Sequence, residues 1–132
     1  MQKIEHIGIA VRDIEESNNL FTRLLGTAPY KSERVDSEGV ITSFFMVGNV
    51  KIELLQALNE ESAIHKHIEK RGEGIHHIAF AVDNVQVEME RLQNEGFQMI
   101  NKEPKDGADG KIIAFLHPGS TNKVLTEICA DK

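Results

Sequence analysis

The chain has 132 residues, of which 40% are hydrophobic, so it is long enough for one well-packed domain and too short for two ordinary ones. Its formal net charge is −6, from 21 acidic and 15 basic residues with no basic run, which argues against a nucleic-acid-binding surface. The single cysteine, Cys129, excludes an internal disulfide and a thiolate cluster, so any bound metal is expected to be held mainly by nitrogen and oxygen atoms.

The chain shows no signal-peptide pattern at its start and no apolar stretch long enough to span a bilayer. We therefore expect a soluble, cytoplasmic protein that does not contact membranes or nucleic acid.

The first predicted strand covers residues 4–11, and a closely similar segment at residues 75–82 repeats it. His6 and His77 occupy matching positions in the two copies, 71 residues apart. Two copies with this spacing indicate a duplicated half-domain, because a solenoid needs more repeats to close its core.

A helix is predicted after each copy. Asp13, with Glu16 three residues later, is typical of a capping box, and Asn84 can cap the second helix. Gly26 and Gly96 are expected to end the two helices. The apolar faces are predicted to consist of Ile14, Phe21, Leu24 and Leu25 in the first helix, and of Val85, Met89 and Leu92 in the second.

Three short strands are predicted in the rest of each half, at residues 28–35, 40–47 and 50–56, and at residues 97–100, 111–116 and 123–130. A linker helix, capped by Asn59 and running to Arg71, is expected between the halves, with Ile64 and Ile68 on one face. The prediction is an α+β fold of two βαβββ modules within one domain, residues 1–132. Module 1 covers about residues 1–58, the linker helix about 59–72 and module 2 about 73–132.

The last strands of the halves also match, because Glu53 and Glu127 each stand within an apolar run. Each residue alone has an ordinary interpretation, as a hydrogen-bonded core histidine or a surface glutamate. An inward-pointing glutamate in such a strand needs a cation, however, and the matched positions of His6, Glu53, His77 and Glu127 favour a metal site. This ligand set suits Zn²⁺, Mn²⁺, Fe²⁺, Co²⁺ or Ni²⁺.

Four other residues of types that can bind metals are not assigned to the site. Strand alternation points His76 away from the face of His77, and His65 and His67, two residues apart on the linker helix, are expected to be surface residues. Cys129 is expected to be a small buried hydrophobic residue.

These residues resemble the glyoxalase and vicinal-oxygen-chelate superfamily, and within it most closely the methylmalonyl-CoA epimerases. The resemblance covers nearly the whole chain and depends on four segments, residues 6–11, 72–80, 103–105 and 114–127. It implies that the two modules form a curved mixed sheet around a metal site, and that the protein is a homodimer.

The resemblance also implies proton transfer at C2 of a 2-substituted malonyl-CoA through a metal-bound enolate. The ligands of one divalent ion (Co²⁺, Zn²⁺, Mn²⁺ or Ni²⁺) would be His6, Glu53, His77 and Glu127, and Glu127 would also be the general base. Thr42 departs from the pattern, because some relatives carry a second base there; Glu38 or a water would have to replace it.

Substrate-binding residues are implied less directly. Backbone amides and the hydroxyls of Ser120 and Thr121 can bind a substrate carboxylate, although the segment is equally typical of an ordinary turn. Lys105 and Lys111 can attract coenzyme A phosphates, or can simply be solvated surface lysines.

Two other functions use the same fold. One is a glyoxalase I-like lactoylglutathione lyase or another isomerase or lyase, which the same ligand set would serve. The other is a metabolite- or drug-binding protein, and retention of all four ligand residues disfavours its metal-free form. An Fe²⁺ dioxygenase is disfavoured because it normally uses two histidines and one carboxylate, which leaves no role for Glu53.

Overall fold

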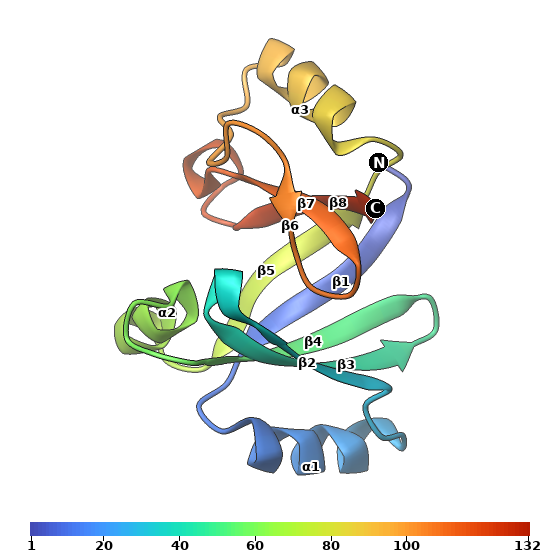
Figure 1. The fold of residues 1–132 in the computed structure, drawn as a ribbon, viewed down its shortest axis with the longest axis vertical. Coiled ribbons are helices and arrows are strands. Elements are labelled where there is room, and N and C mark those ends of the chain that lie inside the picture. The colour runs from blue at the N-terminus through green and yellow to red at the C-terminus, as the bar shows by residue number, and fades with distance from the viewer. The chain divides into compact units, whose positions relative to one another are not determined.

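The computed structural model describes residues 1–132 and contains eight strands and three α-helices (Figure 1). In chain order they are β1 (Lys3–Ala10), α1 (Ile14–Leu25), β2 (Lys31–Val35), β3 (Val40–Val47), β4 (Val50–Ala57), α2 (Ala63–Arg71), β5 (Gly74–Ala81), α3 (Val85–Asn94), β6 (Lys105–Asp106), β7 (Lys111–Leu116) and β8 (Thr126–Asp131). Both halves therefore have the predicted order βαβββ. None of the helices has the length and hydropathy needed to cross a membrane.

The chain divides into two compact units, residues 6–76 and residues 1–5 with 77–132. In the unit of residues 6–76, the strand order is β2-β3-β4-β1. The β1–β4 pair is parallel and the other pairs are antiparallel. Helix α1 lies along one face of these strands (Figure 1), where Val11, Ile14, Phe45 and Leu54 form the buried core.

Helix α1 begins and ends as the sequence predicts. The side chain of Asp13 accepts hydrogen bonds from the backbone N–H groups of Glu15 and Glu16, and Gly26 ends the helix with a φ of 73°. Ile14, Phe21 and Leu25 face the core, but Leu24 is 69% exposed, so its predicted place on the apolar face is wrong. Each residue turns an α-helix by about 100°, which carries Leu24 out of the narrow stripe that Leu25 occupies.

The linker helix is shorter than predicted. Helix α2 starts at Ala63, and its N-cap is Ser62, whose hydroxyl accepts from the N–H of Ile64. The side chain of Asn59 accepts from the N–H of Glu61 and closes a turn before the helix. The predicted cap at Asn59 is therefore wrong, while Ile64 is buried as expected.

In the other unit, the strand order is β5-β8-β7-β6, with β5 and β8 parallel and the remaining pairs antiparallel. Asn84 caps α3 by accepting from the N–H of Val87. The predicted apolar residues Val85, Met89 and Leu92 are buried in a cluster with side chains of β7 and β8. The second helix is thus confirmed in both its start and its buried face.

Residues 97–100 do not form a regular strand: an isolated bridge joins Met99 to Leu116, with one backbone hydrogen bond on each side of it. The N–H of Phe115 donates to the side-chain oxygen of Asn101 instead of a backbone carbonyl, and Pro104 has no N–H to donate. The strand that follows α3 is β6, at Lys105–Asp106. Strand β8 starts at Thr126, after Asn122 and Lys123 adopt left-handed conformations with φ of 54° and 70°.

Ser43 is a buried polar residue of β3. Its side chain is fully buried on the face of β3 that Phe45 shares, and its hydroxyl has no hydrogen-bond partner. Since an unsatisfied buried polar group costs about 1–3 kcal/mol, Ser43→Ala should leave the free energy of unfolding unchanged or raise it by about 1 kcal/mol. Urea unfolding of both proteins measures this, and a loss of more than about 1 kcal/mol would contradict it.

Candidate metal centre

The first histidine–glutamate pair lies within the unit of residues 6–76. Strand β1 runs parallel to β4, with Gly8 opposite Glu53, so β1 places no side chain against the glutamate at that point. His6 reaches Glu53 from two residues earlier, and its Nε2 lies 3.3 Å from Oε1 of the glutamate. Their side chains are only 7% and 6% exposed, so the pair is buried.

Thr42, on the neighbouring strand β3, contacts the same glutamate. Its hydroxyl donates a 2.8 Å hydrogen bond to Oε2 of Glu53, and Thr42 is fully buried. The two carboxylate oxygens of Glu53 therefore have different partners, because Oε1 faces His6 and Oε2 accepts a hydrogen bond from Thr42.

The second pair lies within the other unit and repeats this arrangement. Strand β8 runs parallel to β5 with Ala79 opposite Glu127. Nε2 of His77 is 3.5 Å from Oε1 of Glu127, and both side chains are buried. Phe115 packs edge-on against the His77 ring at a centroid distance of 5.8 Å, and the ammonium group of Lys105 lies 5.8 Å from the centre of the Phe115 ring.

Each pair fits two neighbouring ligands of a divalent cation. Two atoms that bind one cation at about 2.1 Å, at angles of about 90–110°, lie about 3.0–3.4 Å apart. The observed separations, 3.3 Å for His6–Glu53 and 3.5 Å for His77–Glu127, are close to that range. Imidazole nitrogens and carboxylate oxygens are also the donors that first-row divalent metals accept, and burying carboxylates without a cation is costly.

The hydroxyls predicted to bind substrate lie in the segment before β8, where Thr121 bonds within the turn and Ser120 bonds to the segment after α3. Oγ of Ser120 accepts from the N–H of Gln98 at 3.1 Å, and the Thr121 hydroxyl donates to the carbonyl of Val124 at 2.6 Å. These contacts match the ordinary-turn interpretation, and a role in substrate binding stays a prediction. Glu38, considered as a second base, lies in a short 3-10 helix before β3, four residues ahead of Thr42.

The remaining histidines lie apart from these pairs. The ring of His76 meets that of His67 edge-on at 4.9 Å, and His65 contacts Glu69 at 3.4 Å. Like His65, His67 is half-buried and partly exposed at the surface; burial, followed by the charge of Arg71, lowers the pKa of His67. Cys129 is fully buried beside Ala79 and Ile113, as expected for a small hydrophobic residue.

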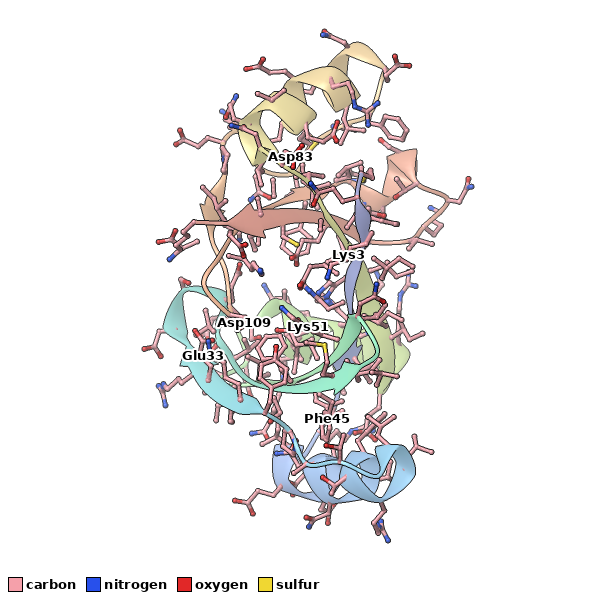
Figure 2. All side chains as sticks on the ribbon, turned by 90° about the vertical axis from the view of Figure 1, so that its right-hand side faces the viewer. Lys3, Glu33, Phe45, Lys51, Asp83 and Asp109 are labelled. Carbon is pink, nitrogen blue, oxygen red and sulfur yellow. The ribbon has the colours of Figure 1, made fainter.

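Sequence reasoning did not single out two buried charged residues, Lys51 and Glu5, which are 9% and 5% exposed. Figure 2 shows Lys51 on the opposite side of the β2–β3–β4 strands from Phe45 and α1. Strand alternation puts Lys51 on the same face as Glu53, two residues later. The alternation of Lys51 and Glu53 along an apolar strand was the sequence signal that could have indicated the burial of Lys51.

Comparison with known proteins identifies the family. Residues 5–115 match the model of the glyoxalase/bleomycin resistance protein/dioxygenase superfamily. The chain belongs to this superfamily. The predicted α+β fold of two βαβββ modules with mixed strand pairing is thereby confirmed as the glyoxalase fold.

Several relatives are similar over the full chain. An uncharacterized protein, YqjC of Bacillus subtilis, is 39% identical over all of this chain and 94% of its own length. The ethylmalonyl-CoA/methylmalonyl-CoA epimerase of Cereibacter sphaeroides is 36% identical over 96% of both chains. A solved structure of a Streptomyces coelicolor methylmalonyl-CoA epimerase variant with 2-nitronate-propionyl-CoA has a TM-score of 0.95 at 31% identity, covering 99% of this chain and 95% of that one. This chain is thus a member of the superfamily that is related to methylmalonyl-CoA epimerases.

Proposed function

We propose that this protein is a metal-dependent epimerase of methylmalonyl-CoA or a closely related 2-substituted malonyl-CoA. The observation that carries the proposal is the pair of buried histidine–glutamate contacts at matching positions of the two halves. The relationship to methylmalonyl-CoA epimerases supports the choice of substrate. His6, Glu53, His77 and Glu127 would together hold one divalent ion, Co²⁺, Zn²⁺, Mn²⁺ or Ni²⁺.

The bound cation would act as a Lewis acid that stabilises negative charge on the thioester oxygen when C2 loses its proton. The chain itself must supply the group that takes this proton. A carboxylate held next to the substrate carbon can do so, since the C2 proton lies between two carbonyl groups and is made removable by this stabilisation.

Glu127 is the better candidate for the base. Both carboxylate oxygens of Glu53 have contacts within the site, because Oε2 accepts a hydrogen bond from Thr42 and Oε1 lies 3.3 Å from Nε2 of His6. Glu53 is therefore suited to a ligand role. We assign proton transfer at C2 to the carboxylate of Glu127, buried beside His77.

We propose that side chains near His77 attract and bind the substrate. Lys105 is exposed and its ammonium group lies over Phe115, whose ring contacts His77, so its positive charge lies near the second pair. We propose that Lys105 attracts the anionic acyl-CoA and that Ser120 and Thr121 help to bind the substrate carboxylate.

Proton exchange tests this function. Wild-type protein loaded separately with each of the four metals should catalyse incorporation of deuterium from D₂O into C2 of methylmalonyl-CoA, measured by mass spectrometry. Turnover of the glutathione hemithioacetal of methylglyoxal without any exchange would instead favour a lactoylglutathione lyase. Binding of these compounds with neither reaction would favour a metabolite-binding protein.

A further inference from the structure

Thr42 occupies a position in β3 from which its hydroxyl reaches Glu53. In the antiparallel β3–β4 pair, Phe44 is opposite Glu53 and Thr42 is opposite Leu55, which makes Thr42 a diagonal neighbour of the glutamate on the same face. Thr42 is completely buried, and its hydroxyl donates to Oε2 at 2.8 Å.

This hydrogen bond restricts how Glu53 can present its oxygens. The last torsion of a glutamate side chain is broad, so an unrestrained carboxylate can rotate and exchange its two oxygens. Here Oε2 is held by Thr42 while Oε1 lies 3.3 Å from Nε2 of His6. The threonine is β-branched and therefore stiff at χ1, which keeps its hydroxyl in place.

We infer that Thr42 is a positioning residue that orients Glu53, so that the glutamate binds the metal through Oε1 beside His6. The inference builds on the proposed metal site and adds a residue that holds a ligand without touching the ion. It also assigns a role to the threonine other than that of a second base, because the hydroxyl acts as a donor to Glu53.

The matched variants are Thr42→Val, which removes the donor but keeps the branched shape, and Thr42→Ser, which keeps the donor. Loss of a residue that orients a metal ligand typically weakens metal binding by about 10–100-fold. We expect that loss for Thr42→Val in Co²⁺ titrations against a competing chelator, with Thr42→Ser remaining within a few-fold of wild type. The visible absorption of bound Co²⁺ should change in Thr42→Val and be restored in Thr42→Ser.

Two controls separate positioning from a general effect on the fold. Ser43→Ala alters the adjacent buried hydroxyl on the opposite strand face and should leave Co²⁺ affinity and absorption unchanged. In a Glu53→Ala background, Thr42→Val should cause no further loss of affinity, because its partner is gone. Thr42→Ala provides a second donor-free variant if Thr42→Val fails to fold.

Wild-type affinity and an unaltered spectrum in folded Thr42→Val or Thr42→Ala would overturn the inference while leaving the metal site intact. An equal loss in the Glu53→Ala background would also overturn it, since the effect would not pass through Glu53. A wild-type protein that binds no Co²⁺ would overturn the proposed metal site together with the inference.

Discussion

Replacing His77 with alanine should remove most of the bound divalent cation, and His6→Ala should do the same. Each histidine is proposed to supply one of four ligands, and each substitution also leaves a buried glutamate without its neighbour. Since loss of a residue behind a ligand costs about 10–100-fold in affinity, loss of a ligand itself should cost at least about 100-fold. Elemental analysis of the purified variants measures the occupancy.

His76→Ala is the matched control. It removes an imidazole from the neighbouring position of the same strand, but its ring packs against His67 and points away from the His77 face. This variant should keep full occupancy, and circular dichroism should show all three variants to be folded. Full occupancy in His77→Ala or His6→Ala, or an equal loss in His76→Ala, would refute the ligand assignment.

The internal repeat allowed the sequence to predict the candidate site. A histidine in the first strand of each half and a glutamate in the last become neighbours, because β1 pairs in parallel with β4 and β5 with β8. The repeat implies the same relation in both halves, and the distances within the two pairs agree with it. Alternation along one strand was enough to separate His77 from His76.

Features that depend on contacts between strands could not be predicted. The hydrogen bond between Thr42 and Glu53 requires the β3–β4 register, which single-strand patterns do not contain. The burial of Lys51, in contrast, could have been predicted from alternation along β4, because Lys51 shares a face with Glu53. Asn59 has the residue type of a helix cap but is used in a turn, because local side-chain chemistry serves both structures.

The absent strand at residues 97–100 has a similar cause. Phe97 and Met99 alternate as strand residues do, and both pack against the core beside α3. The side chain of Asn101 takes a hydrogen bond from β7 that a strand would use for its ladder. Alternation predicted the burial of these residues correctly, but their backbone pairing is limited to two hydrogen bonds, from Ile100 to Phe115 and from His117 to Gln98, and does not form a regular strand.

Glu127→Gln should abolish most of the C2 proton exchange of methylmalonyl-CoA while keeping the metal. An amide oxygen can still bind a cation, but an amide cannot accept a proton at neutral pH. Loss of a general base lowers rates by about 10²–10⁴-fold, so deuterium incorporation should fall by at least about 100-fold at saturating metal. Mass spectrometry of the substrate and elemental analysis of the variant measure the two properties separately.

Glu53→Gln is the matched control, because it makes the same substitution in the other pair. The oxygens of Glu53 face His6 and Thr42, and its proposed role is to hold the metal and not to take the proton. With metal saturating, Glu53→Gln and Thr42→Val should each reduce exchange far less than Glu127→Gln does. Exchange at the wild-type rate in metal-loaded Glu127→Gln would remove that residue from the base role, and a greater loss in Glu53→Gln would transfer the role to Glu53.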